Sequence, residues 1–93
     1  GYLDLYLTFS GFRILPLVAR VEPDYRLSIN PGEVAEAFEV PLKFLMQPDN
    51  HQFLTRDWKG IERRYYAMPF GERYIWGVTA GILRNMYERI YAP

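Results

Sequence analysis

The chain has 93 residues, which suits one small domain, and we expect residues 1–93 to form a single partial domain. Basic and acidic residues number 11 each, so no net field attracts nucleic acid or an anionic membrane. The chain has no cysteine and one histidine, which excludes disulfides, thiolate catalysis and a histidine-based metal site. No apolar run has the roughly 18 residues that cross a bilayer, and we expect a cytoplasmic protein.

The first 21 residues predict a β-hairpin. Tyr2–Phe9 and Phe12–Val21 are rich in aromatic and branched residues, and Ser10–Gly11 supplies a two-residue turn between them. Pro16 lacks the N–H that a strand interior needs, so we expect an irregularity in the second strand.

The next segment reads as loop, because residues 22–32 contain several proline, glycine and asparagine turn signals. Within it, Arg26–Ile29 could form a short extended stretch. Ala37–Val40 is predicted as a short strand, and Pro41 is suited to begin a helical turn over Leu42–Met46.

The remaining chain predicts a second hairpin, a short strand and a helix. Gln52–Trp58 and Ile61–Met68 flank a Lys59–Gly60 turn, and Arg73–Trp76 follows the turn at Pro69–Gly71. The helix shows an apolar stripe at four-residue spacing, formed by Val78, Ile82, Met86 and Ile90. The chain is therefore predicted to fold as a mixed α/β domain.

Three glutamates near a predicted loop-to-strand junction are candidates for chemistry. Glu33 follows Asn30-Pro31-Gly32, and Glu36 and Glu39 come shortly after it. Carboxylates bind hard divalent cations or deprotonate water, but glutamates are also common on solvated loops. In an extended chain Glu33 and Glu36 would point to opposite faces, so the three do not form an evident carboxylate pair.

Two other patterns have structural explanations that we favour. Arg63-Arg64-Tyr65-Tyr66 interleaves cations with rings as nucleic-acid readers do, but zero net charge favours a structural hairpin. His51 has no serine or aspartate placed to complete a triad, so we expect a surface or hydrogen-bonded histidine.

Several stretches together resemble the C-terminal part of the Nudix hydrolases, specifically the coenzyme A pyrophosphatase-like branch. They are Ser10-Gly11-Phe12, the segment from Asn30 to Leu42, and Tyr66-Ala67-Met68-Pro69-Phe70-Gly71 followed by Tyr74-Ile75-Trp76-Gly77-Val78-Thr79-Ala80-Gly81. The resemblance covers essentially the whole chain. No stretch fits the Nudix box, the glutamate-rich motif that binds catalytic Mg²⁺ or Mn²⁺, so the chain resembles the part of the domain that follows the box.

The resemblance implies a partial α/β/α sandwich with a mixed sheet, and a parent enzyme that attacks a diphosphate with a metal-activated water. In this branch the implied substrate is coenzyme A or a related nucleoside diphosphate derivative. Glu33 matches an additional glutamate that many Nudix enzymes place beside the metal. The main metal ligands would lie outside this chain, so we expect the fragment alone to be inactive and to hold no metal tightly.

An alternative is a non-enzymatic interaction module that uses the aromatic-rich hairpin at residues 52–68. Either way, a partial sheet would expose apolar surface, and such surface is usually covered. We therefore expect this chain to associate with another copy or a neighbouring chain through an exposed sheet face.

Overall fold

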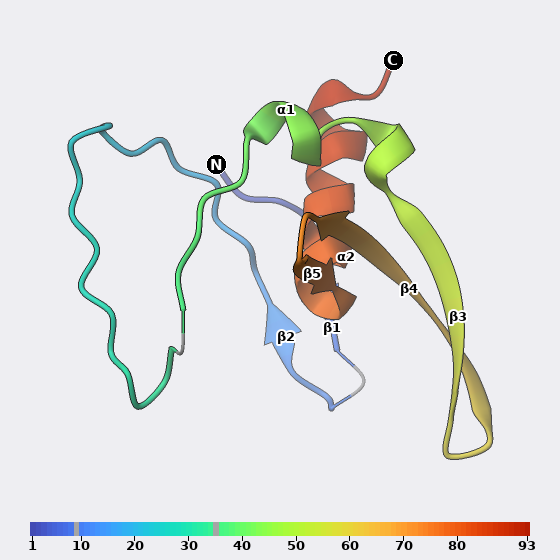
Figure 1. Cartoon of the computed structure of the whole chain (residues 1–93). Helices are drawn as coiled ribbons and strands as arrows, with labels where there is room; N and C mark the ends of the chain where they lie inside the picture. Colours follow the sequence, from blue (N-terminus) through green and yellow to red (C-terminus); the bar gives the residue numbers. More distant parts are fainter. Residues whose placement is uncertain (9, 35) are drawn as a thin grey trace.

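The computed structural model describes residues 1–8, 10–34 and 36–93, with the side chain of Trp58 left undescribed. Two separate antiparallel sheets and two helical regions make up the described part, as Figure 1 shows. The predicted mixed α and β architecture is confirmed, and it is consistent with a partial Nudix fold. None of the described helices is long and apolar enough to cross a membrane.

The first sheet is the predicted N-terminal hairpin, with shorter strands than expected. Strand β1 (Tyr6–Leu7) pairs with β2 (Arg13–Ile14), and Tyr6 lies opposite Ile14. The turn closes where the Thr8 N–H donates to the Phe12 carbonyl at 3.0 Å, and Gly11 supplies a positive φ of 88°. Phe9, predicted to end the first strand, lies outside the described residues.

Pairing continues beyond the two strands, but its register changes. The Leu3 N–H donates to the Pro16 carbonyl at 3.0 Å, and Tyr2 bridges to Leu17. In β1 and β2, by contrast, Tyr6 lies opposite Ile14. Between the two pairs the first strand therefore has one residue more than the second. The ladder is interrupted at Leu15 and Pro16, as predicted for the second strand, but the extra residue lies on the first strand, between Tyr2 and Tyr6.

Residues 22–34 and 36–40 form a wide loop, drawn from light blue to green in Figure 1. The strand predicted at Ala37–Val40 is wrong, and Arg26–Ile29 also forms no strand. Among the described residues, no neighbouring strand pairs with either segment. Their apolar side chains therefore have no cross-strand neighbours to stabilise an extended conformation. Ile29 is 46% exposed and Phe38 is 45% exposed.

Two short helical turns lead from the loop to the second sheet. Helix α1 (Leu42–Leu45) follows Pro41, whose fixed φ of −58° suits a helix start, which confirms the predicted turn. A 3₁₀ turn, η1 (Pro48–Asn50), then leads into the sheet. The Asn50 side-chain amide donates to the Phe44 carbonyl at 2.9 Å and holds the two turns together.

The second sheet has the order β3 (Gln52–Trp58), β4 (Ile61–Phe70), β5 (Arg73–Trp76). The predicted Lys59–Gly60 turn is confirmed, with φ values of 52° and 76° that give the type I′ geometry of two-residue hairpins. Strand β4 runs two residues further than predicted, and its Pro69 lies opposite Tyr74.

Strand β5 passes directly into helix α2 (Gly77–Met86), which a π-helical turn, η2 (Tyr87–Tyr91), extends. Gly77 has a φ of 65°, so this sharp transition favours glycine, and no atom crowds the place of its missing Cβ. The helix packs against β4, where Ala67, Met68 and Ala80 are fully buried. Leu3 and Met46 complete a small core.

Candidate functional site

Glu33 lies in a tight, exposed turn that Asn30 organises. The Gly32 N–H donates to Asn30 Oδ1 at 3.1 Å, and the Glu33 N–H donates to the Asn30 carbonyl at 3.0 Å. The Asn30 side-chain amide also donates to Glu33 Oε2 at 3.3 Å. This turn holds the Glu33 carboxylate beside its own backbone and leaves it open to solvent.

The other two glutamates have partners elsewhere. Glu36 Oε2 forms an ion pair with Arg73 Nη2 at 2.8 Å, which ties the loop to β5. Glu39 Oε1 accepts a hydrogen bond from the Tyr25 hydroxyl across the loop. This hydrogen bond, together with the negative charge of Glu39, raises the pKa of Tyr25 above its usual value of 10.0. The structure therefore does not bring the three carboxylates together.

The acidic residues and His51 are the side chains of this chain that could ligate the metal predicted for the complete enzyme. Within residues 1–8, 10–34 and 36–93, no group of three or more such side chains lies close enough to hold an ion. Divalent cations need several oxygen or nitrogen ligands at once. The described residues therefore do not form a metal centre by themselves, and Glu33 offers one carboxylate.

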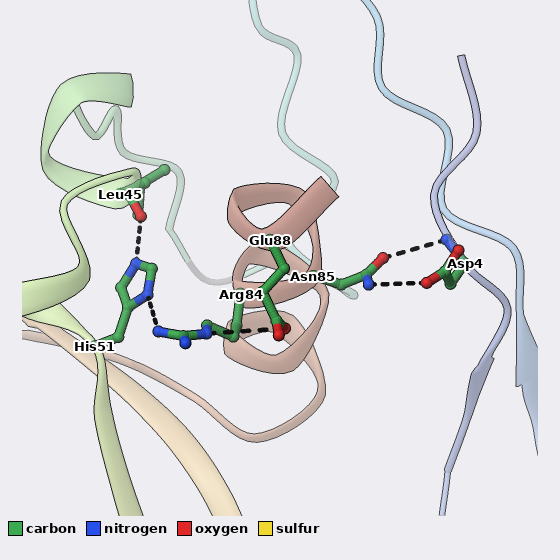
Figure 2. A network of polar contacts seen from close by, with 6 residues as sticks. All are labelled: Asp4, Leu45, His51, Arg84, Asn85 and Glu88. Atoms are coloured by element: carbon green, nitrogen blue, oxygen red, sulfur yellow. Dashed lines mark hydrogen bonds and ion pairs between the residues drawn. The ribbon is translucent and has the colours of Figure 1, made fainter. Parts of the chain in front are cut away.

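His51 is a hydrogen-bonded structural residue, as the sequence predicts. Its Nε2 lies 2.6 Å from the Leu45 carbonyl and its Nδ1 lies 3.2 Å from Arg84 Nη1, as Figure 2 shows. A carbonyl only accepts and a guanidinium only donates, so the neutral ring carries its proton on Nε2. The Tyr87 ring packs edge-on against the imidazole at 5.4 Å. His51 thus joins α1 to α2.

A second set of polar contacts fixes the N-terminal strand region to α2. Two hydrogen bonds join Asn85 to Asp4 (Figure 2). The Asp4 N–H donates to Asn85 Oδ1 at 3.2 Å, and Asn85 Nδ2 donates to Asp4 Oδ2 at 3.0 Å. Arg89 forms an ion pair with the same carboxylate. Asp4 therefore connects the first hairpin to the C-terminal helix.

Two arginines, Arg73 in β5 and Arg84 in α2, lie over aromatic rings of this chain. The Arg73 guanidinium lies 4.9 Å from the Phe38 ring centre, and Arg84 lies over the Tyr66 and Tyr87 rings at 5.3 and 5.2 Å. Arg63 is half-buried and also has a partner within the chain. Within the Arg63-Arg64-Tyr65-Tyr66 pattern, Arg63 and the Tyr66 ring are thus engaged inside the chain, and nucleic-acid binding by the pattern stays untested.

A groove that the sequence did not predict lies between the two sheets. It measures about 450 Å³, and its lining is mainly apolar. Its walls are Tyr6, Leu7 and Thr8 at β1, Arg64 and Tyr65 in β4, and residues 76–79 at the start of α2. The Tyr65 and Trp76 rings meet there edge-on at 5.8 Å. Hydrogen bonding to Tyr65 raises the pKa of the neighbouring Tyr74 above 10.0.

Curated relatives of this chain are Nudix hydrolases. A protein of Photorhabdus laumondii named "Uncharacterized Nudix hydrolase NudL" is 31% identical over 97% of this chain, which covers 48% of that protein. Proteins of the same name from Enterobacter sp. strain 638 and Klebsiella pneumoniae are 30% and 29% identical, over 97% and 99% of this chain. No protein-family model matches the chain, and no solved structure matches it significantly.

The chain spans about half the length of these relatives and corresponds to roughly their C-terminal half. The match extends over nearly all of the described elements, from the first hairpin to η2. The chain therefore belongs to the Nudix hydrolase family, as a partial member.

Proposed function

We propose that this chain supplies the C-terminal half of a Nudix diphosphatase, which hydrolyses a diphosphate bond by attack of water. The observation that carries the proposal is the match to proteins named Nudix hydrolase over 97% of the chain. The described residues contain no metal-binding cluster of their own, so the proposed Mg²⁺ or Mn²⁺ ligands belong to the other half of the domain. This chain alone is then inactive.

The proposed substrate is coenzyme A or a related nucleoside diphosphate derivative. This choice rests on the residues that resemble the coenzyme A pyrophosphatase-like branch, above all residues 66–71 and 74–81. Such a substrate is a small soluble molecule, and the proposal includes a cytoplasmic location. Neither nucleic acid nor a membrane is a proposed partner.

Glu33 is proposed as an auxiliary carboxylate of the site, acting as a base or lying beside the metal. Its turn is fixed by four hydrogen bonds that involve Asn30, and its carboxylate is exposed. Glu36 and Glu39 are engaged by Arg73 and Tyr25. Among the three glutamates, Glu33 is thus the one whose carboxylate contacts a neutral amide and no charged or phenolic group of the described residues, so it can approach a neighbouring part of the domain.

A fusion protein tests the proposed activity. The N-terminal half of the Photorhabdus laumondii relative would be joined to Gly1 of this chain and incubated with coenzyme A and either Mg²⁺ or Mn²⁺. We expect the fusion to produce 3′,5′-ADP and 4′-phosphopantetheine, while this chain alone produces neither. A folded fusion that cleaves no nucleoside diphosphate derivative would refute the diphosphatase proposal, and cleavage of another derivative would refute the coenzyme A assignment.

Two matched variants of the fusion test Glu33. Loss of a positioned general base costs about 10²-fold or more in rate, so Glu33→Gln should lower kcat by at least this factor. Glu36→Gln loosens the loop by removing the pair with Arg73 but keeps the Glu33 carboxylate, so it should lower kcat much less than Glu33→Gln, by under tenfold. Equal effects of the two substitutions would contradict the special role of Glu33.

A second candidate function is a non-enzymatic interaction module that uses the hairpin at residues 52–68. The hairpin projects from the rest of the structure in Figure 1, and Phe53 and Ile61 on it are 54% and 52% exposed. If this chain works as a module, a partner should bind it without the other Nudix half. Phe53→Ser should then abolish binding, whereas in the fusion the same change should leave hydrolysis intact.

A further inference from the structure

Arg73 begins β5 at a well-fixed corner of the second sheet. It lies opposite Phe70 in the antiparallel register, across the tight turn at Gly71, whose φ is 58°. The Phe70 ring packs edge-on against the Phe44 ring of α1 at 4.9 Å. A side chain that starts from a paired and packed element is held more precisely than one that starts from a loop. Arg73 is therefore suited to fix a neighbouring loop segment.

The Arg73 guanidinium contacts two residues of the loop at once. Its Nη2 pairs with Glu36 Oε2 at 2.8 Å, and the guanidinium lies 4.9 Å from the centre of the Phe38 ring. Positions two apart share a side where a chain is extended, which explains how one arginine contacts both. Either contact alone is weak at an exposed site, but here one side chain makes the two together.

Close packing does not hold the loop at this place. A pocket of about 260 Å³ opens between the loop and the turn that precedes β5. Phe38 and Glu39 line it from the loop, and residues 70–73 line it from the turn. Phe38 itself is 45% exposed. The Arg73 contacts, rather than buried apolar surface, therefore fasten the loop to the second sheet here.

The anchor at Glu36 is close enough in the sequence to limit where Glu33 can lie. Glu33 is three positions from Glu36 and eight positions from Pro41, which leads into α1. A chain spans at most about 3.6 Å per residue, so Glu33 stays within about 11 Å of an anchored Glu36 but can lie up to about 29 Å from Pro41. The effective concentration of a tethered group falls as about the −3/2 power of tether length, so opening the anchor lowers it about fourfold.

We propose that Arg73 is a positioning residue, which sets the place of the Glu33 carboxylate by holding Glu36 and Phe38 against β5. Arg73 acts through the loop and not by contact with the substrate. The inference rests on the auxiliary role proposed for Glu33 in the diphosphatase. Loss of Arg73 should therefore lower kcat and leave KM nearly unchanged, because the misplaced carboxylate serves the reaction and not the binding of substrate.

A spin label tests the placement without an activity assay. The chain has no cysteine, so Glu72→Cys at the exposed turn before Arg73 accepts a single nitroxide, which broadens the NMR signals of nearby amides. Arg73→Ala should weaken the broadening of the Glu33 amide about twofold or more, because a longer flexible tether spreads further. The amides of the buried Ala67 and Met68 report that the sheet remains folded. Equal broadening of the Glu33 amide with and without Arg73 would overturn the proposal.

Kinetics of the fusion protein test the consequence for the reaction. Arg73→Ala should lower kcat about fourfold, by the loss of effective concentration, and change KM less than about twofold. Arg56→Ala removes an exposed arginine of β3 and is the matched control, which should change neither constant. Arg73→Lys keeps a charge for Glu36 but not the flat guanidinium over Phe38, so it should retain more of kcat than Arg73→Ala. Equal losses for the lysine and alanine variants would contradict the pair with Glu36.

The Glu33→Gln fusion separates positioning from a general effect on the fold. Arg73→Ala should lower kcat no further in that background, since the carboxylate that Arg73 places is already gone. A further loss of about fourfold there would overturn the proposal, because Arg73 would then act by another route. If Glu33→Gln alone left kcat unchanged, the role proposed for Glu33 would fail instead. The spin label would still decide whether Arg73 sets its place.

Discussion

The Tyr6 hydroxyl in β1 lies directly over Gly81 in α2, where a Cβ at position 81 would stand only 2.7 Å from the oxygen. Two further ring atoms of Tyr6 would lie within 3.1 Å of the same Cβ. The close approach of hairpin and helix therefore depends on the missing side chain. In contrast, a Cβ at Gly77 would meet nothing within 4 Å, so Gly77 is needed for its backbone conformation rather than for packing.

Gly81→Ala should destabilise the chain by about 1 kcal/mol, because forcing Tyr6 aside costs more than the gain in helix propensity. In the Tyr6→Ala background the same substitution should instead stabilise the chain, because the added methyl meets no ring and the gain in helix propensity of about 1 kcal/mol remains. A double-mutant cycle from urea denaturation measures both values. Additive effects would contradict the contact.

His51→Phe should destabilise the chain by about 1–3 kcal/mol. The substitution keeps a ring against Tyr87 but removes the hydrogen bonds to the Leu45 carbonyl and to Arg84. Thermal unfolding followed by circular dichroism measures the loss. Gln52→Leu, at the exposed neighbouring position, is the control and should change stability by less than about 0.5 kcal/mol.

Tyr25 should titrate above pH 10 because Glu39 holds its hydroxyl protonated, first through the hydrogen bond and then through charge. A raised pKa in the folded chain means that the tyrosine contributes stability below the unfolded pKa of 10.0 and loses it as the pH rises through the folded pKa. Glu39→Ala should move the phenol titration back toward 10.0. Ultraviolet absorbance measures it, and an unchanged titration would contradict the assignment.

Glu36→Gln should loosen the loop at residues 22–40 without unfolding the chain. The pair with Arg73 is 38% and 55% exposed at its two side chains, so its loss costs at most about 1 kcal/mol of global stability. Limited proteolysis should nevertheless cut the loop faster, because this pair ties it to β5. Glu33→Gln is the matched control, and faster cutting in that variant would mean that the loop responds to any loss of charge.

The local features of the fold were predictable because their causes are local. Lys59 and Gly60 specify a two-residue turn by their positive φ values, and the four-residue spacing from Val78 specifies the helix. The Ala37–Val40 strand failed for the opposite reason. Its residues suit a strand, but a strand needs a partner, and none of the described segments pairs with it.

The sites were harder to predict because distant residues build them. His51 was expected to form hydrogen bonds, but its partner Arg84 lies 33 positions away, and no spacing rule connects them. The groove requires β1, β4 and the start of α2 to meet, which depends on packing between segments. The turn that carries Glu33 was predictable, since its signal at Asn30-Pro31-Gly32 is encoded within four residues, while the role of Glu33 at a site stays a prediction.

The small core has a thermodynamic consequence. The heat capacity change of unfolding scales with the apolar surface that becomes exposed, and only five of the described apolar residues are buried. The isolated chain should therefore unfold with a heat capacity change well below the usual value of about 1.2 kcal/mol/K for its length, and over a broad temperature range. Calorimetry should give a larger heat capacity change of unfolding for this chain together with the other half of the domain than for this chain alone, because the exposed surface is then covered.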